Sequence, residues 1–333
     1  MTKEGDFALP PWQNTTEGEL RRVGIELEMN GLELDEIAQL TADFLNCEVT
    51  QTSRYERSLK GDPAGEWIVE LDFTLLKKMG REQRVASDLG DEIKSGAEDV
   101  IKWFADGLVP HELVSPPLPM DRLPQVDQLI AHLRKAGAKG TGDRVTNAFG
   151  MQFNPEVPAC EAGVITAYLK AFLCLFDWLN TRADINMTRR LTSYVDPFPA
   201  PYVRKVINKD YAPDMSGLID DYLIDNPTRN RALDMLPLFK HIDEDRVVSK
   251  VGDERIKSRP TFHYRLPDCL IDQPDWGVHV AWNDWVEVER LAADQERLDA
   301  CCQAYGVYLD RGVGRLLHNW EDEVQEKWLS GAA

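Results

Sequence analysis

The chain has 333 residues, of which 43% are hydrophobic and 29% are charged, so it is long enough to bury a sizeable core. Its 57 acidic and 38 basic side chains give a net charge of −19, which argues against binding to a nucleic-acid backbone. No segment resembles a signal peptide, and no run approaches the ~20 apolar residues of a membrane span. We therefore expect a cytoplasmic protein that binds neither nucleic acid nor a membrane.

The first strand expected from the sequence carries two glutamates on one face. It covers residues 23–29, after an extended arm over residues 1–19, and it opens a single domain that covers residues 20–333. Apolar and acidic residues alternate in this strand with a period of two, so Glu26 and Glu28 share its polar face. Two half-buried carboxylates repel each other unless a cation lies between them, and such a pair suits Mg²⁺. A solvated strand face is the alternative.

A second acidic pair follows the first expected helix. Residues 35–46 place apolar side chains at one-face helical spacing, and residues 67–73 again alternate like a strand. In that strand Glu70 and Asp72 share the polar face, although Glu70 could instead pair with a nearby lysine or arginine. Residues 81–105 are expected to form a further helix.

Two more strands with a polar face are expected in the middle of the chain. Glu112 begins a short strand that two prolines end after residue 115. A helix over residues 126–133 follows. In residues 149–154, the apolar side chains alternate with Gln152 and Asn154, which share the polar face.

Two later stretches lack clear periodicity. Residues 159–183 form the most apolar helix, which we expect at the centre of the protein. Residues 188–216 then carry the proline, glycine and charge typical of an active-site loop, and we expect Arg189 or Arg190 at its start to contact phosphate.

The second irregular stretch covers residues 243–261. It contains four cations within ten residues, from Lys250 to Arg259, in a chain that is otherwise strongly acidic. These cations could cover a triphosphate, or they could belong to a solvated hairpin with alternating charges.

The last expected strand has a basic polar face, on which His263 and Arg265 lie two positions apart. A guanidinium can grip phosphate through two hydrogen bonds, whereas a lone histidine is more often structural. Residues 279–305 and 313–329 are expected to form two long helices. The six cysteines show no Cys-x-x-Cys spacing, and Cys301 and Cys302 are expected to pack on a helix face.

The order of these motifs resembles the amidoligase branch of the glutamate-cysteine ligase and glutamine synthetase superfamily. The resemblance covers roughly residues 20–290 and begins with Gly24-Ile25-Glu26-Leu27-Glu28. It implies an α+β fold with a curved, mainly antiparallel sheet that has a polar catalytic face and is flanked by helices. It also implies ATP, two or three Mg²⁺ ions and formation of an amide bond.

The resemblance also implies roles for individual residues. Glu26, Glu28 and Glu112 would be metal ligands, Asp72 a metal or substrate residue, Gln152 and Asn154 residues that reach nucleotide or substrate, and Arg265 a phosphate-binding residue. Residue type and position, apart from the resemblance, add Glu70 as a further metal ligand and Arg259, Lys250 and Arg189 or Arg190 as further phosphate contacts. His263 stands where relatives have a carboxylate, and Gln152-Phe153-Asn154 stands where many have His-x-His. Both departures concern the third metal site, where Mn²⁺ is an alternative to Mg²⁺.

The sequence thus predicts an ATP-dependent amidoligase that joins a small-molecule or peptide carboxylate to an amine through an acyl phosphate. The alternatives are a metal-dependent phosphotransferase or hydrolase on the same fold, and a family member that has lost catalysis. Neither the substrates nor the oligomeric state follows from the sequence.

Overall fold

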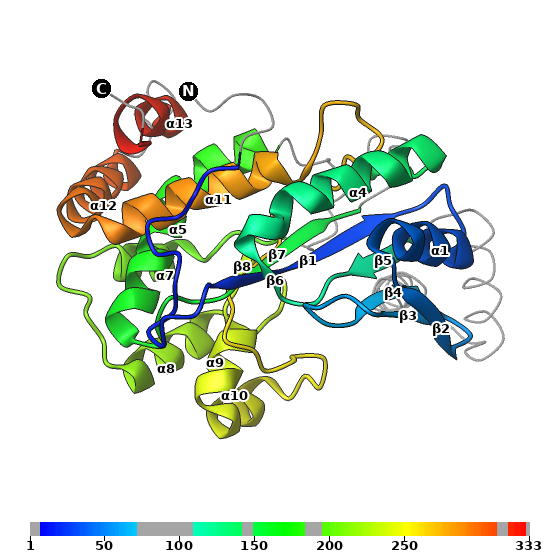
Figure 1. Ribbon diagram of the computed structural model, residues 1–333. Helices are drawn as coiled ribbons and strands as arrows, with labels where there is room; N and C mark the ends of the chain where they lie inside the picture. Colours follow the sequence, from blue (N-terminus) through cyan, green and yellow to red (C-terminus); the bar gives the residue numbers. More distant parts are fainter. Residues whose placement is uncertain (1–6, 72–108, 142–148, 184–194, 312–318, 331–333) are drawn as a thin grey trace, which may run out of the picture.

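The protein is a mixed α+β structure built on one large antiparallel sheet, as predicted (Figure 1). This computed structural model describes residues 7–71, 109–141, 149–183, 195–311 and 319–330. The sheet has the strand order β2-β3-β4-β5-β1-β7-β9-β8, and β6 pairs with β1. The strands are β1 (Arg22–Met29), β2 (Glu48–Ser53), β3 (Glu56–Lys60), β4 (Trp67–Leu71), β5 (His111–Val114), β6 (Leu118–Pro119), β7 (Met151–Pro155), β8 (Leu233–Asp234) and β9 (His263–Tyr264).

Helices cover the sheet and extend beyond its β8 end (Figure 1). They are α1 (Leu34–Leu45), α4 (Leu123–Ala136), α5 (Ala162–Arg182), α7 (Ala200–Val206), α8 (Met215–Asp225), α9 (Leu236–Ile242), α10 (Glu244–Val251), α11 (Val278–Ala293), α12 (Gln295–Asp310) and α13 (Trp320–Glu323). A 3-10 turn (Met120–Arg122) precedes α4, and a π-helical turn (Val324–Trp328) follows α13. In Figure 1, α4 and α11 lie on one side of the sheet, and α9 and α10 lie on the other.

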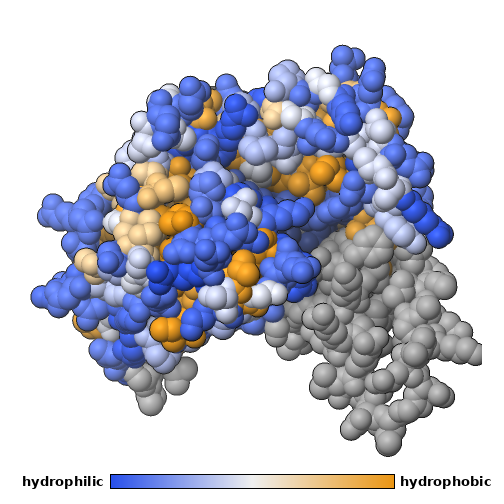
Figure 2. Space-filling view, turned by 90° about the horizontal axis from the view of Figure 1, so that it is seen from below, coloured by the Kyte–Doolittle hydropathy of each residue, from blue (hydrophilic) through white to orange (hydrophobic). Residues whose placement is uncertain are grey.

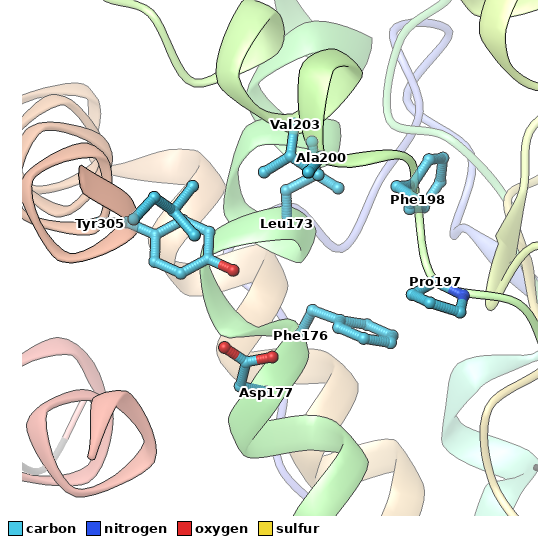
Figure 3. Close-up of a pocket in the computed structure, with 9 residues that line it drawn as sticks. Leu173, Phe176, Asp177, Pro197, Phe198, Ala200, Val203 and Tyr305 are labelled. Atoms are coloured by element: carbon cyan, nitrogen blue, oxygen red, sulfur yellow. The ribbon is translucent and has the colours of Figure 1, made fainter. Parts of the chain in front are cut away.

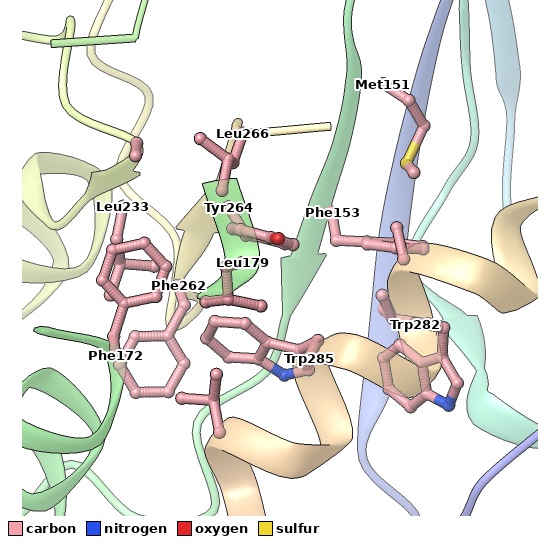
Figure 4. Close-up of a cluster of buried hydrophobic side chains, with 14 of the residues drawn as sticks. Met151, Phe153, Phe172, Leu179, Leu233, Phe262, Tyr264, Leu266, Trp282 and Trp285 are labelled. Atoms are coloured by element: carbon pink, nitrogen blue, oxygen red, sulfur yellow. The ribbon is translucent and has the colours of Figure 1, made fainter. Parts of the chain in front are cut away.

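The alternating pattern of β1 separates the two faces of the sheet. Val23, Ile25, Leu27 and Met29 are fully buried, whereas the glutamates between them are only partly buried. Farther along the sheet, Phe153 of β7 meets Trp282 of α11 edge to face, with ring centroids 5.7 Å apart. Figure 4 shows this apolar layer, in which the tryptophans of α11 lie beneath β7 and β9. Burial of these side chains is the main force that holds the sheet to its helices.

The central helix α5 is the most apolar, as predicted. It is long and apolar enough to cross a membrane, but 67% of its apolar window is buried within the protein, as expected of a core helix. The sequence analysis placed this segment at the centre of the protein, and its burial agrees with that prediction.

A buried ion pair fixes the start of β1. Arg21 donates to both carboxylate oxygens of Glu289 on α11, at 2.7 and 2.9 Å, and both side chains have no exposed surface. The same guanidinium donates to the carbonyls of Trp12 and Glu156. Tyr168 also donates to Glu289, at 2.8 Å. The Arg21 side chain therefore connects the N-terminal arm and β1 to α11 and to the end of β7.

Several expected boundaries were wrong. The predicted helix over residues 279–305 is two helices, because Asp294 leaves the helical conformation and its side chain caps α12 by accepting from the Arg297 amide. The irregular stretches also contain helices: α7 and the start of α8 lie within residues 188–216, and α10 lies within 243–261. Asp243 caps α10, a short amphipathic helix that the charge pattern had hidden.

The hairpin of β2 and β3 was not predicted, because most β2 side chains are exposed and show no apolar alternation. The helix expected over residues 81–105 lies outside the described residues.

Candidate active site

Four glutamates lie in one row across the polar face of the sheet. In the antiparallel registers Glu28 of β1 opposes Glu112 of β5, Glu112 opposes Glu70 of β4, and Glu70 opposes Glu56 of β3. All four side chains are half-buried. The sequence predicted three of these residues as metal ligands, and the sheet brings those three onto adjacent strands. Glu56 was missed because β3 shows no alternation of apolar and polar residues.

Such a row is unfavourable without positive charge. Directly opposed side chains on one face have Cβ atoms about 5 Å apart, and like charges at that separation repel. A divalent cation would offset the repulsion with the oxygen ligands that Mg²⁺ prefers. Within the described residues no three His, Cys, Asp or Glu side chains already lie close enough together to hold a metal ion. Asp72, the remaining predicted carboxylate, lies outside those residues.

Glu26 points into a separate, mixed-charge group beside this row. Its side chain is 13% exposed and accepts a hydrogen bond from Asn154 Nδ2 at 2.8 Å. Arg259 Nη2 lies 3.6 Å away, and His263 Nε2 lies 4.0 Å away. Burial alone would raise the pKa of Glu26, but the charge of His263 when it is protonated at low pH, the charges of Arg259 and Arg265, and the Asn154 hydrogen bond lower it. Glu26 is therefore an anion near neutral pH.

Glu28 is held by the neighbouring strand β7. The Gly150 amide donates to Glu28 Oε2 at 2.6 Å, and Gln152 Nε2 approaches Glu28 Oε1 at 3.4 Å. Gln152 also lies directly opposite Glu26 in the register of β1 and β7. This amide thus links the carboxylate row to the group around Glu26.

His263 is buried between two hydrogen-bond acceptors. Its Nε2 lies 2.7 Å from Gln152 Oε1, which also accepts from Arg265 Nε at 3.3 Å, and its Nδ1 lies 3.5 Å from Asp234 Oδ2. Burial lowers the pKa of His263 to about 4, although Asp234 and Glu26 pull it upward. The ring is therefore neutral near pH 7, and its single N–H cannot serve both acceptors.

Three arginines converge on the β9 side of this group. Arg265 donates to the carbonyl of Arg229, and burial together with the charge of Arg265 lowers the pKa of Arg229. Arg259 is brought toward Glu26 because residues 260 and 262 form backbone hydrogen bonds with the end of β7. Clustered guanidinium groups repel one another and suit a ligand with several negative charges.

The site contains an unusual number of buried polar atoms without a hydrogen-bond partner among the described residues. They are Asn154 Oδ1, Arg229 Nε, Asp234 Oδ2, Arg259 Nε, Thr261 Oγ1 and His263 Nδ1. Buried polar groups are nearly always satisfied in folded proteins, so a cluster of exceptions indicates a place that water or a ligand fills. This set has donors for an anion and acceptors for a cation or an amine.

The structure does not bring every predicted residue to this site. Lys250 is exposed in the last turn of α10, and no contact among the described residues joins it to Glu26 or the arginines. Within residues 250–259, all of which the structure describes, Arg259 lies 3.6 Å from Glu26, and the charge of Arg255 acts on Arg229. Arg189 and Arg190 lie outside the described residues, so their role stays a prediction.

Two site residues were missed from the sequence. Asp234 is fully buried on β8 directly opposite His263, and Arg229 lies beside Arg265. Asp234 did carry a signal, since it is an acid within the apolar run of residues 232–239, where an ionisable group needs a partner. The sequence around Arg229 contains no comparable feature that would indicate a role in the site.

Figure 2 shows the protein from below, where hydrophilic residues cover most of the described area and smaller apolar patches lie between them. A separate cavity of about 150 Å³ lies between α5, α7 and α12 (Figure 3). Its lining is mainly apolar and includes Phe176, Phe198 and Tyr305 but none of the predicted site residues.

Comparison with known proteins agrees with the polar sheet face. A family model described as "putative amidoligase enzyme" matches residues 19–287, which include every described strand and all the site residues above. The chain belongs to this amidoligase family. No curated protein and no solved structure matches the chain. The relation to the glutamine synthetase fold therefore rests on family membership.

Amidoligases typically depend on ATP and Mg²⁺, and the residues of this chain fit both. The row of opposed glutamates offers oxygen ligands for a hard cation, and the unsatisfied Nε atoms of Arg229 and Arg259 offer donors for phosphate. The two sets meet at Gln152, which contacts both Glu28 and Arg265.

Proposed function

We propose that this amidoligase is an ATP- and Mg²⁺-dependent carboxylate–amine ligase that forms a γ-glutamyl or peptide-like amide bond on the polar face of its sheet. The observation that carries the proposal is the carboxylate row on β4, β5 and β1, which Gln152 of β7 links to a cluster of arginines that contains unsatisfied buried donors. Few other chemistries need both sets within one site.

Each set has its own role in the proposal. Glu28, Glu112 and Glu70 would hold Mg²⁺, together with Glu26 at the edge of the arginine group. The metal and ATP supply charge neutralisation and a transferable phosphoryl group, so that the substrate carboxylate is activated as an acyl phosphate. Arg259 and Arg265 orient the phosphates, since a guanidinium can bind them through two hydrogen bonds.

The neutral His263 ring is suited to the amine. A protonated ring would repel an incoming ammonium group, whereas the neutral ring can accept a hydrogen bond from the amine and orient it. Asp234 Oδ2 and Asn154 Oδ1 provide further unsatisfied acceptors in the same place. The proposed substrates are therefore a small-molecule or peptide carboxylate and a primary amine.

The test is release of ADP by purified protein with ATP, Mg²⁺ and pooled amino acids, amines and short peptides. A ligase requires both a carboxylate and an amine for full turnover, and the product gains an amide bond that mass spectrometry can identify. ADP release with a single acceptor would indicate a phosphotransferase, and release with neither would indicate a hydrolase. No nucleotide or metal binding at millimolar concentration would show that this family member has lost catalysis.

A further inference from the structure

Two cysteines from different helices meet far from the polar sheet face. Cys174 of α5 and Cys302 of α12 are 128 residues apart in the sequence, yet their Sγ atoms lie 3.6 Å apart. This distance corresponds to a thiol–thiol contact, and a disulfide would need the sulfurs to approach to about 2.05 Å. Cys301 also lies within interaction range of Cys174.

The two thiols differ in acidity. The hydrogen bond from Cys174 lowers the pKa of Cys302; burial opposes this effect, and the Lys170 ammonium adds to it. Burial and the neighbouring thiols raise the pKa of Cys174. Lys170 is itself buried one helical turn before Cys174, where it donates to the Asn208 carbonyl at 3.3 Å. The pair thus combines a thiol whose pKa is lowered with one whose pKa is raised.

Solvent reaches only one member of the pair. Cys302 lines an open groove of about 740 Å³ between α12 and the segment after α7, together with Asn208, Lys209, Asp299 and Gln303. Cys174 has no exposed surface and does not line this groove. A small polar oxidant can therefore approach Cys302 first.

We propose that Cys302 is a peroxide-reactive thiol and that Cys174 is its resolving partner. The Cys302 thiolate attacks one oxygen of hydrogen peroxide, which breaks the O–O bond, releases hydroxide and leaves a sulfenic acid on Cys302. The Cys174 sulfur then attacks the Cys302 sulfur, its proton leaves with the hydroxyl group as water, and a disulfide forms between α5 and α12. Peroxide accepts the two electrons that the thiols lose.

The remaining cysteines provide matched controls. Cys160 is exposed, so access alone would make it the fastest to react, but burial of its sulfur and nearby glutamates raise its pKa. Cys269 is fully buried, and its pKa is raised as well. The proposal thus predicts that a nearly buried thiol reacts with peroxide before an exposed one.

The experiment treats the native full-length protein with substoichiometric hydrogen peroxide, traps sulfenic acid with dimedone, and maps the peptides without reduction. We expect a Cys174–Cys302 disulfide in the wild type. Cys174→Ser should accumulate dimedone on Cys302, and Cys160→Ser should behave like the wild type. Lys170→Gln should raise the pKa of Cys302 and slow its oxidation by peroxide about threefold for each pKa unit. The loss is smaller than the fall in the thiolate fraction because the thiolate of a less acidic thiol is a stronger nucleophile.

Two results would overturn the proposal. One is faster oxidation of Cys160 than of Cys302 in the wild type, where the oxidation of each cysteine is counted as its dimedone adduct plus its disulfide. The other is a disulfide that joins Cys301 to either partner in preference to the Cys174–Cys302 bond. Both results are measured on the wild-type protein, so the proposal can be tested even if a variant does not fold.

Discussion

Replacing Glu289 by glutamine should cost a large part of the stability of this protein. The change keeps the volume of the side chain but removes the negative charge that Arg21 contacts through two hydrogen bonds. Both groups have no exposed surface, so the guanidinium is left as a buried cation whose other contacts are the neutral carbonyls of Trp12 and Glu156. Removing one partner from a buried pair costs about 3–5 kcal/mol.

That loss is large beside the 5–15 kcal/mol by which native proteins are usually stable. Guanidinium-induced unfolding, followed by circular dichroism and tryptophan fluorescence, should show a lower midpoint with an unchanged slope. Asp220→Asn is the matched control, because Asp220 also accepts two hydrogen bonds from an arginine, Arg246, but at the surface. It should cost about 1 kcal/mol or less. If both variants lost the same free energy of unfolding, burial of the Arg21–Glu289 pair could not be the reason for the large loss expected in Glu289→Gln.

Three further changes test the site and its surroundings. Glu26→Gln and Glu28→Gln should each abolish Mg²⁺-dependent ATP turnover with circular dichroism preserved, and full turnover in both would contradict the metal role. Arg265→Lys should lower ATP turnover at least about tenfold, because lysine cannot bind phosphate through two hydrogen bonds, and calorimetry would show whether ATP affinity or only stability falls. Asp62, whose pKa the Arg122 hydrogen bonds hold at about 2, is more acidic in the folded state than its usual 3.8. Its contribution of about 2 kcal/mol should thus be complete above pH 4 and vanish as the pH falls to 2, which acid titration of unfolding in wild type and Asp62→Asn would measure.

The strands that build the site could be predicted because each one alternates. In β1 the apolar residues fill the core on one side, and this requirement places Glu26 and Glu28 on the other. The same reasoning placed Glu70, Glu112 and Gln152 correctly on the polar face. The residues of a strand do not show which strand pairs with it. The positions of Glu28, Glu112 and Glu70 opposite one another therefore follow only from the strand registers in the structure.

The parts that could not be predicted depend on short elements. Asp234 lies on β8, a strand of two residues that is too short to show a period, whereas the strand that carries His263 was predicted without its neighbour β8. Their pairing joins segments about thirty residues apart and is fixed by the packing of Tyr264 and Leu233 on the opposite face. Asp294 divided a predicted helix because a capping residue outweighed the continuous apolar pattern around it.

The unsatisfied polar atoms around β7 and β9 also have a thermodynamic consequence. No described protein group supplies a hydrogen bond to these atoms, so a ligand that supplies one contributes to the stability of the native state. A compound that binds only the native state raises the melting temperature in proportion to the logarithm of its concentration over its dissociation constant. Melting curves recorded with candidate nucleotides, acids and amines would therefore rank the substrates before any turnover is detected.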